Sequence, residues 1–337
     1  MVNWSKYEGV CYDDVLLVPM YSTLNSRTDC NPYTTILVRG NFNTIQEKEV
    51  SPIIAANMAA ITTSDMIKAL KAESVIVPVH RFCDTQEQFD VLNKGDAFDF
   101  LTAVSVGLDD RERIEFLEDS VNMFFLELAH AGTKRAVEEV KWISTTFPNH
   151  VLIVGNVATY ETAAPLFDAG ATYVKVGIGP SGVCSTREIT GVGIPQLSAI
   201  IDCSRAGPII GDGGLRNSGD CVKAIAAGAS FIMTGSLLAG TNESLKDGYG
   251  QHLYYGSASE KNGRVKPGHV PEGIAISNVP PKGPAAKVVQ NLMAGIRQGM
   301  SMIGATTLGE LREMAVFQKV TTNCYLENST HFNITHK

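Results

Sequence analysis

Short apolar runs alternate with longer helix-like segments along most of this chain, and this rhythm limits the fold more than any other feature. From Val50 onward the runs have strand length and lack internal polar alternation, as expected for strands that are buried on both faces. Helix signals lie between them, such as Thr63 before one apolar-periodic stretch and Thr159 before an Ala-rich run closed by Gly170. We expect eight strands, at Ile53–Ala56, Val75–Val79, Leu101–Val106, Met123–Leu128, Val151–Val154, Tyr173–Val176, Pro208–Gly211 and Phe231–Thr234.

Eight strand-helix units over roughly 250 residues have the size of a (β/α)8 barrel. The sequence therefore predicts an α/β fold in which residues 1–337 form a single (β/α)8 TIM barrel domain. Residues 1–49 are expected to be an N-terminal arm, and residues 260–284 a flap inserted between the eighth strand and a last helix at 285–302. A doubly wound open sheet is the alternative, but it would more naturally have fewer strands and a glycine fingerprint near its first turn.

Composition excludes several classes of function. The 337 residues are 44% hydrophobic and 19% charged with a formal net charge of -7, which opposes a broad nucleic-acid or anionic-membrane footprint. No apolar run approaches the roughly 18 residues that span a bilayer, and the start of the chain lacks a signal-peptide core. Seven scattered cysteines without a C-x-x-C pair indicate reduced thiols. We expect a cytoplasmic protein without nucleic-acid or membrane partners.

One glycine-rich loop, between Lys175 and Pro195, carries a candidate nucleophile. Its glycines let the backbone turn sharply and approach a ligand, while Cys184 supplies a thiol and Thr186 a hydroxyl. A tight turn that merely holds a small residue is the alternative, because a motif stays a hypothesis until its context fits.

Two further glycine loops follow the seventh and eighth expected strands. In (β/α)8 barrels the loops at these positions commonly bind phosphate through backbone N–H groups. Here they hold Asp212-Gly213-Gly214 and Gly235-Ser236, and the aspartate suits a ribose diol. The alternative is that glycine simply ends each strand. The residues thus indicate a phosphorylated small molecule held beside a cysteine.

Several motifs together resemble the IMP dehydrogenase/GMP reductase family. The similarity covers about residues 10 to 305, and the cysteine loop is its most specific part. The motifs are Tyr12 to Pro19, Ser26 to Asp29, Gly155 to Val157, Lys175 to Pro180, Cys184 to Arg187, Thr190 to Gln196 and Asp212 to Gly214. This resemblance implies a barrel, usually tetrameric, whose cysteine attacks C2 of a purine nucleotide and which exchanges a hydride with a nicotinamide cofactor.

Three features favour the reductase branch of the family. The segments Ala55 to Met58, Val79 to Phe82 and Tyr255 to Glu260 look like GMP reductase. About twenty residues separate Phe82 from Leu101, so the CBS pair that most dehydrogenases insert there is absent, and the flap lacks their Arg-Tyr pair. The alternatives are an IMP dehydrogenase without CBS domains, converting IMP to XMP with NAD, and a catalytically silent purine-nucleotide-binding barrel.

For a reductase, the resemblance implies NADPH-dependent reductive deamination of GMP to IMP and ammonia. Cys184 would form a thioimidate at C2, and a relay of Thr186 and Glu272 would protonate the departing amine. An acid is needed because amide ion is too poor a leaving group. Glu272 could instead be a solvated flap carboxylate.

The resemblance also implies roles for other residues. The substrate-binding set would be Met58, Asp212, Gly213, Gly214, Gly235, Ser236, Tyr255, Gly256, Ser257 and Gly273. Glu127, Ala129 and His130 would lie near the cofactor, and backbone carbonyls of Gly177, Gly179 and Cys184 would form a potassium site. A turn without an ion is the alternative at those carbonyls. We expect a homotetramer.

Two departures from the family pattern concern the cofactor side. Glu127 stands where the family usually has aspartate, and the extra methylene is enough to disturb a near-attack geometry. Ala59 replaces an acidic residue that often follows Asn-Met. His130 could equally be a core histidine.

Overall fold

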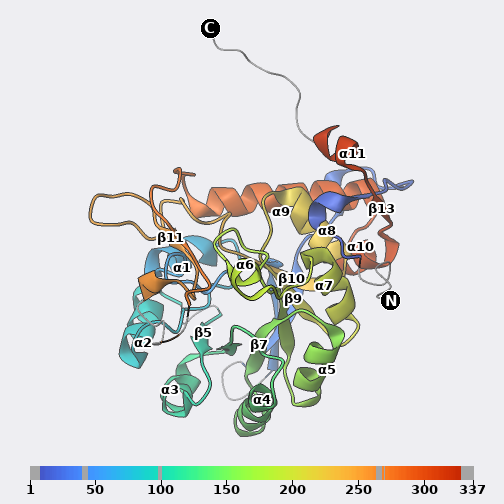
Figure 1. Cartoon of the computed structure of the whole chain (residues 1–337). Coiled ribbons are helices and arrows are strands. Elements are labelled where there is room, and N and C mark those ends of the chain that lie inside the picture. Colours follow the sequence, from blue (N-terminus) through green and yellow to red (C-terminus); the bar gives the residue numbers. More distant parts are fainter. Residues whose placement is uncertain (1–7, 40–44, 98–100, 263–267, 269, 328–337) are drawn as a thin grey trace.

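The chain folds into a curled sheet of seven parallel strands surrounded by helices (Figure 1). This computed structural model describes residues 8–39, 45–97, 101–262, 268 and 270–327. The strand order β4-β10-β9-β8-β7-β6-β5 places the first strand of the sheet beside the last, which curls the sheet. The strands are β4 (Ile53–Ala55), β5 (Ala103–Val106), β6 (Met123–Glu127), β7 (Val151–Val157), β8 (Tyr173–Val176), β9 (Ile209–Asp212) and β10 (Ala229–Thr234).

The remaining predicted strand, Val75–Val79, does not form a regular ladder. It makes one parallel bridge to each edge of the sheet, Ile76 to Ile54 and Val79 to Val104. Pro78 lies inside this segment and has no N–H to donate, which interrupts a ladder. Seven of the eight predicted strands are therefore confirmed, and the prediction of a regular strand at Val75–Val79 was wrong. The fold is TIM-barrel-like.

Helices cover the outer face of the sheet (Figure 1). Their starts follow the expected capping signals: the Thr63 hydroxyl accepts a hydrogen bond of 3.1 Å from the Met66 N–H at the start of α1. The helices are α1 (Ser64–Lys71), α2 (Thr85–Lys94), α3 (Arg111–Leu117), α4 (Lys134–Thr146), α5 (Tyr160–Asp168), α6 (Thr186–Thr190), α7 (Gln196–Ser204), α8 (Ser218–Ala226), α9 (Ala285–Ile303), α10 (Leu308–Met314) and α11 (Thr322–Glu327). The last helix predicted at the flap's end, 285–302, corresponds to α9.

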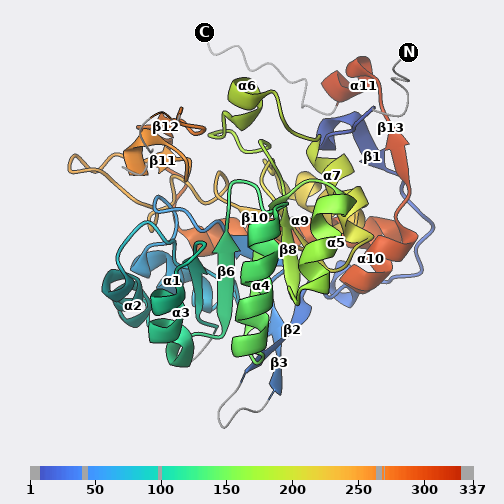
Figure 2. The same cartoon turned by 60° about the horizontal axis from the view of Figure 1, so that its bottom comes forward.

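The amino-terminal end of the curled sheet is closed. An antiparallel hairpin of β2 (Thr34–Arg39) and β3 (Ile45–Val50) lies there, at the bottom of Figure 2. Its buried side chains Ile36 and Val38 belong to one apolar cluster with Phe125, Phe231 and Met233 from the strands. Packed apolar side chains therefore fill this end of the interior and leave the opposite end for a site.

Described residues of the segment predicted to be an N-terminal arm contact the rest of the chain. Strand β1 (Val15–Leu17) pairs with β13 (Phe317–Lys319), near the other end of the chain. Arg216 donates hydrogen bonds of 2.7 and 2.5 Å to the Asp13 carboxylate, and the Lys223 ammonium donates one of 2.8 Å to the Tyr12 carbonyl.

Residues 235–284 connect β10 to α9 and include the segment predicted to be a flap. The short strands β11 (Tyr254–Tyr255) and β12 (Ala275–Ile276) pair within this connection. Figure 2 shows them beside α6 at the end of the molecule opposite the β2–β3 hairpin. Residues 263–267 and 269 of the predicted flap lie outside the described residues.

Candidate active site

A cavity of about 690 Å³ opens at the carboxyl ends of the strands. Its walls come from the ends of β6 to β10, from the loops that follow β8, β9 and β10, and from the connection that contains β11 and β12. This is the end at which (β/α)8 enzymes build their sites.

The loop after β8 presents Cys184 to this cavity. It starts at Gly177, whose φ of +150° and closeness to the Asp212 carbonyl leave no room for a side chain. Arg187 then folds back over the loop, donating from Nε to the Ile178 carbonyl at 3.1 Å and from Nη2 to the Ile194 carbonyl at 2.6 Å. These bonds tie both ends of the loop together and fix the position of the cysteine.

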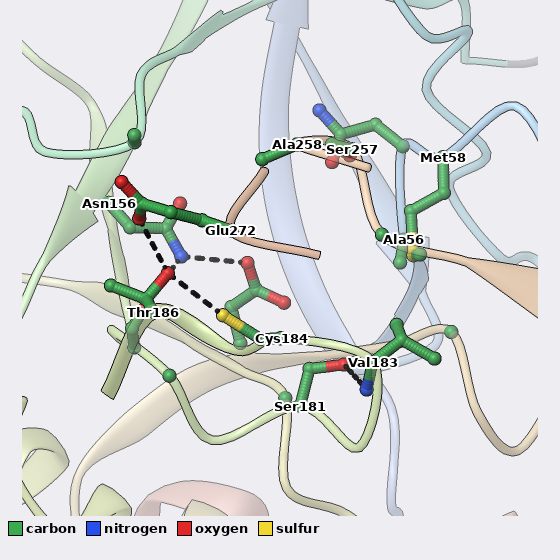
Figure 3. Close-up of a pocket in the computed structure, with 18 of the residues that line it drawn as sticks. Ala56, Met58, Asn156, Ser181, Val183, Cys184, Thr186, Ser257, Ala258 and Glu272 are labelled. Atoms are coloured by element: carbon green, nitrogen blue, oxygen red, sulfur yellow. Dashed lines mark hydrogen bonds between the residues drawn. The ribbon is translucent and has the colours of Figure 1, made fainter. Parts of the chain in front are cut away.

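Cys184, Thr186 and Glu272 form a continuous hydrogen-bonded relay (Figure 3). The Cys184 thiol lies 3.2 Å from the Thr186 hydroxyl, which donates to the Glu272 carboxylate at 2.8 Å. All three residues line the cavity. A nucleophile, a hydroxyl and a carboxylate in contact can move a proton between the thiol and an acid-base group.

Backbone pairing holds Glu272 against the cysteine loop. Cys184 and Gly273 form an antiparallel bridge, the Ser185 N–H donates to the Glu272 carbonyl at 3.0 Å, and the Ile274 N–H donates to the Val183 carbonyl at 3.0 Å. The connection after β10 thus adds a short strand to the cysteine loop. Glu272 is therefore placed by main-chain register rather than by its side chain alone.

A second set of polar side chains lies at the ends of four neighbouring strands. We call this set the strand-end layer, and its members are Glu127, Asn156, Lys175 and Asp212. The buried Lys175 ammonium lies 3.0 Å from Glu127 Oε1 and 3.0 Å from Asp212 Oδ2. The Asn156 amide donates to the same Asp212 oxygen at 2.9 Å.

Charge and burial act together on this layer. Burial works to lower the pKa of Lys175, but the carboxylates of Asp212 and Glu127 outweigh it and raise that pKa to about 12. Burial raises the pKa of Glu127, against the opposing effect of the Lys175 ammonium. Sequence reasoning missed Lys175 and Asn156 as site residues. A lysine within the apolar run Tyr173–Val176 is the signal that could have revealed one of them.

Most residues of the expected substrate-binding set line the cavity. The exceptions are Tyr255 and Gly273; Tyr254 lines the cavity instead, because adjacent strand residues point to opposite sides. Burial raises the pKa of Tyr254 to about 12. The lining members of the set are Met58, Asp212, Gly213, Gly214, Gly235, Ser236, Gly256 and Ser257.

Of the three residues expected near the cofactor, two line the cavity and one does not. Glu127 and Ala129 line the cavity, whereas His130 is exposed and does not. Arg81 and Phe82, which had not been assigned, lie on the cavity wall, with the Arg81 guanidinium 5.0 Å from the Phe82 ring centre.

Gly177, Gly179 and Cys184, whose carbonyls are candidate potassium ligands, all line the cavity. The Gly177 carbonyl already accepts a hydrogen bond of 2.8 Å from the Asn156 amide. Within the described ranges, no three His, Cys, Asp or Glu side chains gather as metal ligands. A carbonyl-only potassium site stays a prediction.

Comparison with known proteins defines the class of this molecule. The family model for the IMP dehydrogenase / GMP reductase domain matches residues 9–331, so the chain belongs to this family. GMP reductase 2 from Homo sapiens is 37% identical over 329 residues, covering 92% of this chain and 94% of that protein. Inosine-5′-monophosphate dehydrogenase from Aquifex aeolicus is 41% identical over 255 residues, covering 68% of this chain and 51% of that protein.

Solved structures agree with the sequence relatives. A variant of GMP reductase from Trypanosoma brucei, in complex with guanosine 5′-monophosphate, superposes with a TM-score of 0.86 at 26% identity. The match covers 98% of this chain and 100% of the Trypanosoma brucei chain. In the part of the chain that the structure describes, no helix is long and apolar enough to cross a membrane.

Proposed function

We propose that this protein is a GMP reductase, which converts GMP to IMP and ammonia with NADPH as reductant. The hydrogen-bonded relay of Cys184, Thr186 and Glu272 carries this proposal, since binding alone needs none of the three. The full-length similarity to GMP reductases from several organisms supports it.

The relay has the parts that deamination needs. The Cys184 thiol gives up its proton along the relay, and the thiolate adds to C2 of GMP. The C2–N bond then breaks as Thr186, backed by Glu272, returns a proton to the amine, which leaves as ammonia. The thioimidate that remains on Cys184 is released as IMP when C2 is reduced and the C–S bond breaks.

Another group of residues in the cavity lining suits a nicotinamide cofactor. Glu127, Ala129, Arg81 and Phe82 line it, giving an aromatic wall and a carboxylate that is compatible with a ring that becomes cationic. A bound NADPH supplies the hydride that replaces the amino group at C2. Glu127 and Phe82 would hold and orient its ring, and Asp212 with the glycine loops would hold the nucleotide.

Absorbance at 340 nm tests the proposal. Purified protein with GMP and NADPH should lose absorbance and form ammonia and IMP, and Cys184→Ser should abolish both. A parallel reaction with IMP and NAD tests the alternative dehydrogenase, which the Aquifex relative at 41% identity favours. NADH formed there, with silence in the first reaction, would reject the reductase, and silence in both would favour a silent nucleotide-binding barrel.

Three finer expectations belong to this proposal. Potassium at the Gly177, Gly179 and Cys184 carbonyls predicts that replacing K⁺ by Li⁺ lowers turnover. A homotetramer predicts a fourfold mass in light scattering. A preference for NADPH over NADH is read from the ratio of their kcat/KM values.

A further inference from the structure

The buried cation of Lys175 lies between two carboxylates that line the cavity. Only 2% of the Lys175 side chain is exposed, and its ammonium contacts Glu127 on the expected cofactor side and Asp212 on the expected nucleotide side. Two carboxylates close to one ammonium leave a net negative charge in a mostly enclosed place. Removing the cation would leave two mostly buried carboxylates without a positive partner, which is unfavourable.

The sheet is built so that Lys175 can reach Glu127 across an intervening strand. In the register, Glu127 on β6 lies opposite Gly155 on β7, and Gly155 lies opposite Lys175 on β8. A Cβ at position 155 would collide with the Cβ of Lys175. The missing side chain at Gly155 therefore opens the path along which the ammonium crosses β7.

The two oxygens of Asp212 have different partners. Oδ2 receives both Lys175 and Asn156, at 3.0 and 2.9 Å. Among the described residues, no group donates to Oδ1, while 20% of the side chain stays exposed on the cavity wall. One oxygen is thus fixed by the protein, and the other is left to accept hydroxyl groups from a ligand.

We propose that Lys175 is a positioning residue that aims Asp212 at the hydroxyl groups of the nucleotide's sugar and offsets the charge of Glu127 beside it. The inference rests on the proposed function, because it takes the ligand to be a purine ribonucleotide. The longer Glu127 side chain fits this arrangement, since its extra methylene is taken up by the ion pair with Lys175 rather than by the space for the cofactor.

Calorimetric titration of two ligands tests the role of Lys175. One ligand is GMP and the other is its 2′,3′-dideoxy analogue, which lacks the hydroxyls that Asp212 would bind. Lys175→Met should weaken GMP binding about 30-fold, as expected for the loss of a buried charged partner. Affinity for the dideoxy analogue should change less than about 3-fold, because Lys175 acts through the sugar hydroxyls. A general loss of structure at the site would instead lower the affinity for both ligands equally.

A double variant tests the role of charge. Glu127→Gln alone should bind GMP within about 3-fold of the wild type, because Lys175 still holds Asp212. Lys175→Met/Glu127→Gln should recover at least about 5-fold of the affinity lost in Lys175→Met, since the competing carboxylate is gone. Lys223→Met is the control: its ammonium is half-buried and bonds the Tyr12 carbonyl, and Lys223 is not part of the cavity lining.

The outcomes separate the two proposals. Wild-type protein that binds no GMP rejects the proposed function. Wild-type protein that binds GMP, with Lys175→Met binding it equally well, losing both ligands equally or gaining nothing from Glu127→Gln, rejects the role of Lys175. Circular dichroism checks each fold, and Lys175→Gln carries the same predictions if the methionine variant does not fold.

Discussion

The relay and the strand-end layer face the same cavity but are built from different parts of the chain. Cys184 and Glu272 lie on loops, Thr186 is the first residue of the short helix α6, and backbone pairing brings together these two segments that are far apart in sequence. The strand-end layer stands on four adjacent strands of the sheet, where burial and ion pairs hold it. The groups of the proposed covalent chemistry thus lie on connections held by hydrogen bonds, whereas the groups proposed to orient a ligand lie on the sheet itself.

This difference predicts how variants should behave. A change in the relay should lower turnover with little effect on folding, because few core contacts depend on it. A change that removes or displaces the Lys175 ammonium should lower stability and ligand affinity together, because its ion pairs serve both.

The largest effect should follow from removing the relay's acid. With Glu272→Gln we expect kcat to fall about 10²- to 10⁴-fold, the range typical of a lost general acid-base group. The affinity for GMP and the thermal midpoint should stay close to wild type. A loss of GMP affinity equal to the loss of kcat would show instead that Glu272 binds the substrate.

Gly155→Ala should break the strand-end layer. The new methyl group collides with Lys175, so we expect the free energy of unfolding to fall by about 1–3 kcal/mol, as in other overpacked cores, along with weaker GMP binding. Urea denaturation and GMP titration measure the two effects. Unchanged stability would mean that β7 can move away without cost.

Gly256→Ala is the matching change beside the relay. A Cβ there would lie 2.9 Å from the Val183 carbonyl, so the connection after β10 must shift away from the cysteine loop. We expect kcat to fall about 10-fold through misplacement of Glu272, with an unfolding midpoint close to wild type. Gly248→Ala is the control, since a Cβ at that glycine meets no atom within 4 Å. An equal loss of kcat in Gly256→Ala and Gly248→Ala would contradict the interpretation that Gly256→Ala acts by displacing Glu272.

The smallest effect concerns pH. Burial raises the pKa of Glu127 above its ordinary 4.5, so the folded protein holds this proton more tightly than the unfolded chain. Its contribution to stability is complete below pH 4.5 and is lost as pH rises through the raised value. Relative to wild type, Glu127→Gln should therefore gain stability across this interval. Urea midpoints of both proteins between pH 4 and 7 measure this gain in stability. A difference between the two midpoints that does not change with pH would contradict the prediction.

Sequence reasoning identified site residues on loops more readily than site residues on strands. Cys184 was found because glycines and a nucleophile are adjacent in the chain, and seven strands because their apolar runs are continuous. Lys175 was missed because its partners come from distant segments, Glu127 and Asp212, and only the sheet register brings them together. That Tyr254 rather than Tyr255 lines the cavity could not be read from the sequence, because β11 has only two residues, too few for a pattern to show which side faces the cavity.

The closed amino-terminal end of the curled sheet has a kinetic consequence. The β2–β3 hairpin and its apolar cluster fill that end, and the cavity opens at the opposite end, where the strands finish. Two reactants that enter at the same end of a cavity bind one after the other. For the proposed nucleotide and cofactor, we therefore expect the molecule that sits deeper to bind first and leave last, which predicts an ordered sequence of binding and release.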